Sequence, residues 1–198
     1  MPKKVDHQQR RAAMAEALWK VAAYQGLEAV SLSRVAQEAG VSKGRVQHYF
    51  PSRDALLDYT ATRVQDRVNQ RIRANLHQAS GSIDATRAAL LGVLPLDTES
   101  AIDTRVGFAF FIRSLGDPAL RQRYRERNQQ FIDLLVHYLT RAHDEGILDS
   151  SQEPQSAAVA LFALVNGLKE PILLGDQSPT EAITIIDGAL ELLTHRAR

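Results

Sequence analysis

Residues 31–50, SLSRVAQEAGVSKGRVQHYF, restrict the possible fold more than any other part of the chain. In the first half of this segment apolar residues recur at helical spacing, at Leu32, Val35, Ala36 and Ala39. They form one apolar face of a helix. Gly40 follows at once, and glycine often ends a helix because it accepts the left-handed conformation at little cost. Ser42 is placed to cap a new helix through its hydroxyl. The segment therefore predicts two short helices joined by a tight turn.

The second of these helices, residues 43–49, is short and strongly polar. Arginine and lysine side chains donate to guanine O6 and N7, and glutamine pairs with adenine N6 and N7. A helix-turn-helix that reads DNA has this asymmetry, because its first helix packs and its second enters the major groove. Gly44 also lets the backbone approach a groove closely. The alternative is a polar helix face that only meets solvent.

The flanking segments support the DNA-reading interpretation. Residues 9–26, QRRAAMAEALWKVAAYQG, precede the two helices, and residues 48–59, HYFPSRDALLDY, follow them. Together the three segments resemble the amino-terminal domain of the tetracycline-repressor (TetR) family of transcriptional regulators, over about the first third of the chain. The residues that carry the resemblance are, in order, Gly26, Ser31, Val35-Ala36, Ala39-Gly40-Val41-Ser42, His48-Tyr49-Phe50 and Arg53-Asp54-Ala55-Leu56.

Two positions depart from the family pattern. Gln47 stands where an aromatic residue is common, and Arg45 stands where a small or hydroxylated residue is common. Both change the expected DNA sequence rather than the class of protein. The DNA contacts that the resemblance implies are Ser31, Ser33, Lys43, Gly44, Arg45, Gln47, His48, Tyr49 and Arg53. For Tyr49 the alternative to a DNA contact is packing on the first helix, and for Ser31 the alternative is capping of the helix alone.

The charge of the chain is divided unevenly. Residues 1–53 contain nine Lys/Arg and four Asp/Glu, a net of +5, which leaves 15 of the 24 basic and 19 of the 23 acidic residues for the remainder, a net of −4. Such an asymmetry is typical of nucleic-acid binding. The alternative is that solvated helix faces differ in charge. The amino-terminal tail is also basic, with Lys3, Lys4, Arg10 and Arg11. This tail either reaches DNA or stays unbound.

Helical periodicity continues along the whole chain, and no sustained two-residue alternation interrupts it. Glycine and proline breakers separate the candidate helices. We expect an all-α protein of about nine helices, with a three-helix helix-turn-helix DNA-binding domain over residues 1–53 and a larger helical bundle over residues 54–198. The expected helices are residues 7–25, 32–39, 43–49, 53–78, 83–94, 99–115, 118–145, 154–174 and 179–196.

Several classes of protein are not indicated. The chain has no cysteine, which excludes disulfides and thiolate sites. It has no HExxH, GxSxG or glycine-rich phosphate loop, and His137 and His143 are six residues apart rather than three or four. We therefore expect no catalytic residue, no metal and no cofactor. We expect no window to approach the ~20 apolar residues of a membrane span, and we therefore expect a cytoplasmic protein without a membrane partner.

The resemblance implies that the second domain binds a small-molecule effector and dimerises. Residues 106–115 and 131–139 are too apolar for helices on the surface, so we expect them in a core, around a cavity. The alternatives are that the arginines pair with helix neighbours and that Asn166 finds its partners in its own backbone or across the dimer. The candidate effector residues are Arg105, Phe108, Phe111, Arg113, Tyr124, Asn128, Phe131, Leu135 and Asn166.

The last helix has two apolar stripes, whereas a surface helix needs only one. The helix before it is rich in small residues that allow a close helix approach. These patterns predict a homodimer held by the last two helices; the alternative is a helix buried centrally in one chain. The expected interface residues are Ala157, Leu161, Leu164, Ile183, Ile186, Leu190 and Leu193.

The sequence thus indicates a homodimeric regulator, more simply a repressor, that binds a roughly palindromic operator in double-stranded DNA and responds to an unidentified small molecule. The alternatives are a DNA-binding regulator without an effector, a helical protein-interaction adaptor, and a helical enzyme or carrier with an incidental helix-turn-helix.

Overall fold

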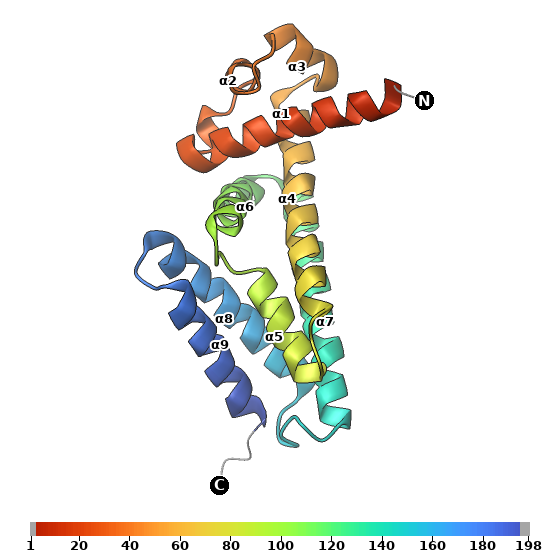
Figure 1. Ribbon diagram of the computed structural model, residues 1–198, viewed down its shortest axis with the longest axis vertical. Helices are drawn as coiled ribbons and strands as arrows, with labels where there is room; N and C mark the ends of the chain where they lie inside the picture. The colour runs from red at the N-terminus through yellow and green to blue at the C-terminus, as the bar shows by residue number, and fades with distance from the viewer. Residues whose placement is uncertain (1–2, 195–198) are drawn as a thin grey trace. The chain divides into compact units, whose positions relative to one another are not determined.

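The computed structural model describes residues 3–194, with the side chains of residues 3–6 and of Leu27 left out. Within these residues the chain is all-α, as predicted, and Figure 1 shows the helices in order. The side chains of Lys3 and Lys4 lie outside the described part. The elements are α1 (Lys3–Gln25), a 3-10 helix (Leu27–Ala29), α2 (Leu32–Glu38), α3 (Lys43–Tyr49), α4 (Arg53–Leu76), α5 (Ser82–Gly92), α6 (Thr98–Gly116), α7 (Pro118–Asp144), α8 (Pro154–Leu174) and α9 (Pro179–Thr194).

The ends of the helices follow local side-chain chemistry. Asp97 begins α6 with a capping box, in which its carboxylate accepts from the Ser100 N–H and the Ser100 hydroxyl accepts from the Asp97 N–H. Asp117 caps α7, and its Oδ1 accepts from the Leu120 N–H. Gly175, at φ +82°, ends α8 in the left-handed conformation. These signals are local, so the sequence predicts most boundaries to within two residues.

The helices form two compact units whose border differs from the predicted domain boundary. One unit takes the chain as far as Arg67 together with Ile102–Arg113, and the other takes Val68–Ala101 together with the chain from Ser114 onward. Helices α4 and α6 therefore each contribute to both units. The first turns of α4 belong with α1–α3 because Leu56 and Leu57 are fully buried. The functional division at residue 53 remains a prediction.

The first unit is built on α1, which packs against α2, while α2 packs against α3. Figure 1 shows α1 (red) running beneath α2 and α3. Leu18, Val35 and Val46 are buried at this junction, and Phe50 closes it where α3 ends. These side chains fix which faces of the two short helices turn outward.

A polar cluster joins α1, α4 and α6 inside the first unit. The indole Nε1 of Trp19 donates to Oδ1 of the buried Asp103 at 2.8 Å. The guanidinium of Arg67 lies 4.3 Å from the centre of the Trp19 ring, and its Nε is 3.7 Å from the same carboxylate oxygen. Arg67 also pairs with Glu16 at 3.0 Å. The sequence alone indicates no role for these four residues.

The second unit is a bundle of α5, α7, α8 and α9, with the last turns of α4. Its apolar core includes Leu90, Leu139, Val165 and Ile186, each fully buried. Gly92 allows α5 to approach α4, because a Cβ there would lie 2.7 Å from Cγ1 of Ile72 and 2.9 Å from its Cα.

Helix α8 contradicts the expectation that no window approaches the length of a membrane span. Among the described residues it alone is long and apolar enough, by length and composition, to cross a membrane, with a mean hydropathy of 1.6. The expectation of no such window was therefore wrong. One face of α8, including Ala158, Leu161 and Val165, packs into the bundle core, as the apolar helix of a core does.

Candidate nucleic-acid interface

Helix α2 is held at both ends by local hydrogen bonds. The Ser31 hydroxyl accepts from the Arg34 N–H at 3.1 Å, so its capping role is present in the structure. At the other end Gly40 adopts φ +64°, and the Val41 N–H returns to the Ala36 carbonyl at 2.9 Å. Ser33 is exposed in the first turn of this helix, where it is free of the core.

Helix α3 presents its polar side chains to solvent because one apolar residue anchors it. Ser42 caps it by accepting from the Arg45 N–H at 3.2 Å, and the fully buried Val46 turns one face inward. The structure thus brings together the base-reading candidates on one outer surface, which we call the α3 face. Its exposed members are Lys43, Gly44, Arg45, Gln47 and His48.

Gly44 has no packing role within the chain. A Cβ built at this position would meet no heavy atom within 4 Å, so the fold itself tolerates a side chain. The open backbone at Gly44 is therefore available for a close approach to a partner, as expected for a helix that enters a groove.

Tyr49 packs within the first unit. Its ring centre lies 4.5 Å from that of His7 on α1 and 5.3 Å from that of His48, and the two histidine rings are 6.4 Å apart. The alternative in which Tyr49 packs on the first helix is what the structure shows. A phosphate contact from its hydroxyl remains a prediction.

Two arginines of this unit take part in its own packing. Arg53 Nε donates to the Val30 carbonyl at 2.7 Å, which ties the start of α4 to the chain before α2. The Arg11 guanidinium lies 5.1 Å from the Phe50 ring centre and 4.9 Å from that of Tyr59. Arg11 thus packs on aromatic rings instead of extending as a tail residue, since guanidinium groups are attracted to ring faces.

The nine candidate effector residues are divided between the two units. Arg105, Phe108, Phe111 and Arg113 belong to the part of α6 in the first unit, and Tyr124, Asn128, Phe131, Leu135 and Asn166 belong to the second. Arg113 pairs with Asp54 at 2.6 Å, and Arg105 and Phe111 are exposed.

In the second unit, Leu135 is fully buried in the apolar core, so it packs where a cavity lining was expected. Asn166 Nδ2 donates to the Phe162 carbonyl at 2.8 Å, which is the backbone alternative stated above. The ring centres of Phe131 and Phe162 lie 6.3 Å apart and join α7 to α8.

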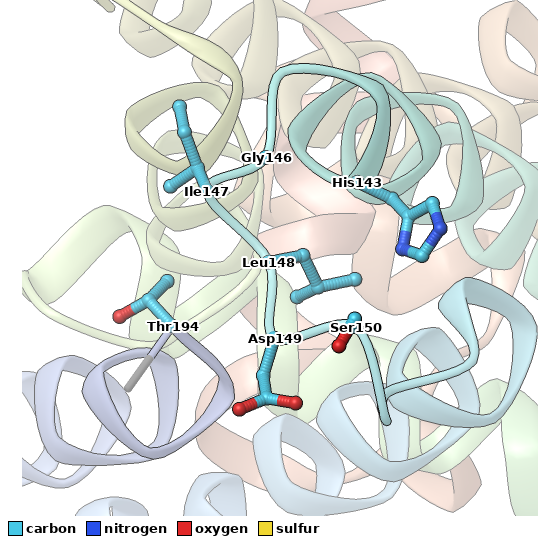
Figure 2. Close-up of a pocket in the computed structure, with 7 residues that line it drawn as sticks. All are labelled: His143, Gly146, Ile147, Leu148, Asp149, Ser150 and Thr194. Carbon is cyan, nitrogen blue, oxygen red and sulfur yellow. The ribbon is translucent and has the colours of Figure 1, made fainter. Parts of the chain in front are cut away.

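A hollow of about 400 Å³ lies where α7 ends, α8 approaches and α9 ends (Figure 2). None of the nine candidate effector residues lines it. The lining residues are His143, Gly146, Ile147, Leu148, Asp149, Ser150 and Thr194.

The expected dimer residues lie mainly on the inner face of their helices. Ala157, Leu161, Ile186 and Leu190 are buried in the core of their own chain, so the structure corrects the choice of stripe. Leu164 and Leu193 are partly buried against that core, and Ile183 is half-buried. The opposite face of the two helices, which we call the α8–α9 outer face, is exposed at Val159, Ala160, Ala163, Gly167 and Leu174 of α8 and at Ile185 and Leu192 of α9.

A capped helix-turn-helix with a polar outer face in one unit, and a helical bundle in the other, define a helix-turn-helix transcriptional regulator. Residues 15–60 match the family model of the bacterial regulatory proteins of the TetR family, and residues 82–195 match that of the carboxy-terminal domain of BetI-type transcriptional repressors. The chain belongs to the TetR family of transcriptional regulators.

Individual relatives agree with this assignment. The regulator PksA of Bacillus subtilis is 30% identical over 168 residues, which cover 85% of this chain and 80% of PksA. The BetI regulator of Burkholderia mallei is 30% identical over 172 residues, which cover 85% of this chain and 84% of BetI.

Solved structures show the same fold. A transcriptional regulator from Rhodococcus sp. RHA1 superposes with a TM-score of 0.80 at 28% identity, covering 92% of this chain and 95% of its own. A regulator from Saccharomonospora viridis, solved in complex with choline, superposes with a TM-score of 0.88 at 20% identity, covering 96% of this chain and all of its own.

Proposed function

We propose that this TetR-family regulator is a cytoplasmic repressor that binds a roughly palindromic operator as a homodimer and is released by a small-molecule effector. The α3 face carries the proposal. It places lysine, arginine and glutamine side chains, the groups that read base edges, on the exposed side of a capped helix. Two such helices in one dimer would enter successive major grooves ~34 Å apart.

The α8–α9 outer face supports the dimer. It carries large exposed apolar side chains, with Leu192 78% and Leu174 68% exposed. A Cβ built at Gly167 or Gly188 would meet no heavy atom within 4 Å, so packing within the chain does not require these glycines. Glycines and alanines on an apolar helix face allow a second pair of helices to approach closely. We therefore propose the outer face, in place of the buried stripe, as the surface that a second copy covers.

The second unit supports an effector. It matches a carboxy-terminal domain of BetI-type repressors, and a structural neighbour holds choline. An effector that prefers one separation of the two heads would lower operator affinity by its differential binding to the two states. A regulator without an effector, or an adaptor without a DNA role, is the alternative to be tested.

The test begins with selection of a cognate site from a random double-stranded DNA library, followed by fluorescence anisotropy at several salt concentrations. We expect a selected site with two half-sites, and binding that weakens steeply with salt. Arg45→Ala should weaken binding, and Arg125→Ala, which removes the same charge from an exposed position of α7, should not. Failure to enrich any sequence, together with the loss of salt-dependent retention on a DNA column, would favour the adaptor.

A further inference from the structure

Two cationic side chains of the second unit, one on α7 and one on α8, lie near enough for the charge of one to act on the other. Lys169 of α8 donates to Oδ1 of Asn166 at 3.0 Å. The guanidinium of Arg127 on α7 lies 4.1 Å from the centre of the Tyr124 ring. Neither cation forms an ion pair with a carboxylate within the described residues. We call Lys169, Arg127, Asn166 and Tyr124 the Lys169 cluster.

The surroundings make this charge costly. Burial first, and the charge of Arg127 second, lower the pKa of Lys169 to about 8. At pH 7 roughly nine-tenths of the lysine is still protonated. Two like charges in a partly apolar setting are stabilised when an anion lies between them. The cluster therefore has the electrostatics of an incomplete anion site.

The cluster is also held in place. Asn166 directs its amide oxygen at Lys169 because its amide nitrogen is bonded to the Phe162 carbonyl at 2.8 Å. The Tyr124 ring supports the Arg127 guanidinium from one side. The lysine ammonium has three donors and the guanidinium has a planar fork of donors, and both suit a carboxylate. Lys169, Arg127 and Tyr124 are each half-buried, so a ligand can reach them from solvent.

The neighbours of the cluster indicate what the rest of the ligand is. Phe162, whose carbonyl holds Asn166, also packs its ring near that of Phe131. Both rings are partly buried against the apolar core. Ligand sites commonly combine such apolar walls with a few polar groups that fix orientation. A quaternary ammonium has the same sign of charge as Lys169 and Arg127, so it is disfavoured here.

We propose that the Lys169 cluster binds the carboxylate of an apolar organic acid and that this acid acts as the effector. The role as effector rests on the function proposed above, whereas the anion site does not.

Calorimetry without DNA tests the site at pH 7, with sodium octanoate, octanol and octyltrimethylammonium as probes of one chain length and three charges. We expect octanoate to bind at least ten times more tightly than the other two. Lys169→Met and Arg127→Leu should each weaken octanoate binding at least tenfold, and Lys169→Arg should retain most of it. The matched controls Lys20→Met and Arg125→Leu, at exposed positions, should leave it unchanged.

Equal binding of the three probes would overturn the site, and so would full octanoate affinity in both folded variants. If Lys169→Met fails to fold by circular dichroism, Arg127→Leu decides. The effector role is then tested by operator anisotropy, where octanoate should lower the affinity of the wild type and not that of Lys169→Met. Lys169-dependent octanoate binding without any change in operator affinity would overturn the effector role alone. Absence of specific DNA binding by the unliganded protein would overturn the proposed function, and the calorimetry would still decide the site.

Discussion

Trp19 Nε1 donates a hydrogen bond of 2.8 Å to Oδ1 of Asp103, two residues separated by 84 positions in the sequence. Trp19 is the only tryptophan of the chain, and Asp103 is a buried carboxylate. Arg67 lies over the same indole and beside the same carboxylate. The contact therefore joins α1, α4 and α6 through one buried charge and the groups that compensate it.

We expect Asp103→Ala to lower the free energy of unfolding by about 2–4 kcal/mol, because it leaves the indole N–H and the Arg67 guanidinium without their buried partner. Trp19→Phe keeps a ring and loses only the donor, so it should cost about 1–2 kcal/mol. Urea unfolding followed by circular dichroism measures both. Glu16→Gln is the control, since Glu16 is half-exposed and should cost less than about 1 kcal/mol. A loss for Asp103→Ala no larger than that of the control would contradict this account.

Arg45→Ala should weaken binding to the selected operator by about 1–3 kcal/mol and relax the preference at one base position, as loss of a bidentate base contact does. Binding to the operator and to its single-base variants, measured by anisotropy, checks this. If all sequences weaken equally, Arg45 contacts phosphate instead.

Local signals made most of the fold predictable from the sequence. Gly40 and Ser42 act within one turn of the chain, so the helix-turn-helix and the exposed α3 face follow from the residues themselves. The Trp19–Asp103 contact could not be predicted in the same way. It depends on which helices meet, and nothing local distinguishes Asp103 from the other acidic residues of its helix.

The choice of the apolar stripe for the dimer interface shows a second limit of prediction from the sequence. Helix α9 has two adjacent apolar stripes, and periodicity does not say which of them faces the core of its own chain. The structure buries Ile186 and Leu190 and exposes Ile185 and Leu192. Of the Lys169 cluster, Tyr124 and Asn166 were expected from the sequence, whereas Lys169 and Arg127 were missed for a related reason. Nothing in the sequence signals Lys169 or Arg127, because the effect of one charge on another across two helices depends on tertiary structure.

We expect Leu192→Glu to dissociate the homodimer while each chain stays folded, because Leu192 is 78% exposed on the α8–α9 outer face. Ile186→Glu should unfold the second unit instead, since it buries an unpaired charge in the core. Sedimentation velocity and circular dichroism separate the two results. A folded dimer with unchanged operator affinity in Leu192→Glu would place the interface elsewhere.

The last prediction concerns the charge of Lys169 and the pH dependence of stability. The native pKa of Lys169 is lowered from 10.5 to about 8, by burial first and by Arg127 second. Between these two values the unfolded chain binds a proton that the native chain does not. The free energy of unfolding therefore increases as pH rises through this window. Below pH 8 both states are protonated and the full cost of the buried charge remains. Lys169→Met should therefore stabilise the protein at pH 7 by up to about 3 kcal/mol, and this advantage should shrink toward pH 10.5. Urea unfolding of the variant and the wild type at pH 7 and pH 10 measures the difference, with Lys20→Met as the exposed control. The same advantage at both pH values would show that lost packing or chain entropy, rather than the buried charge, explains the effect.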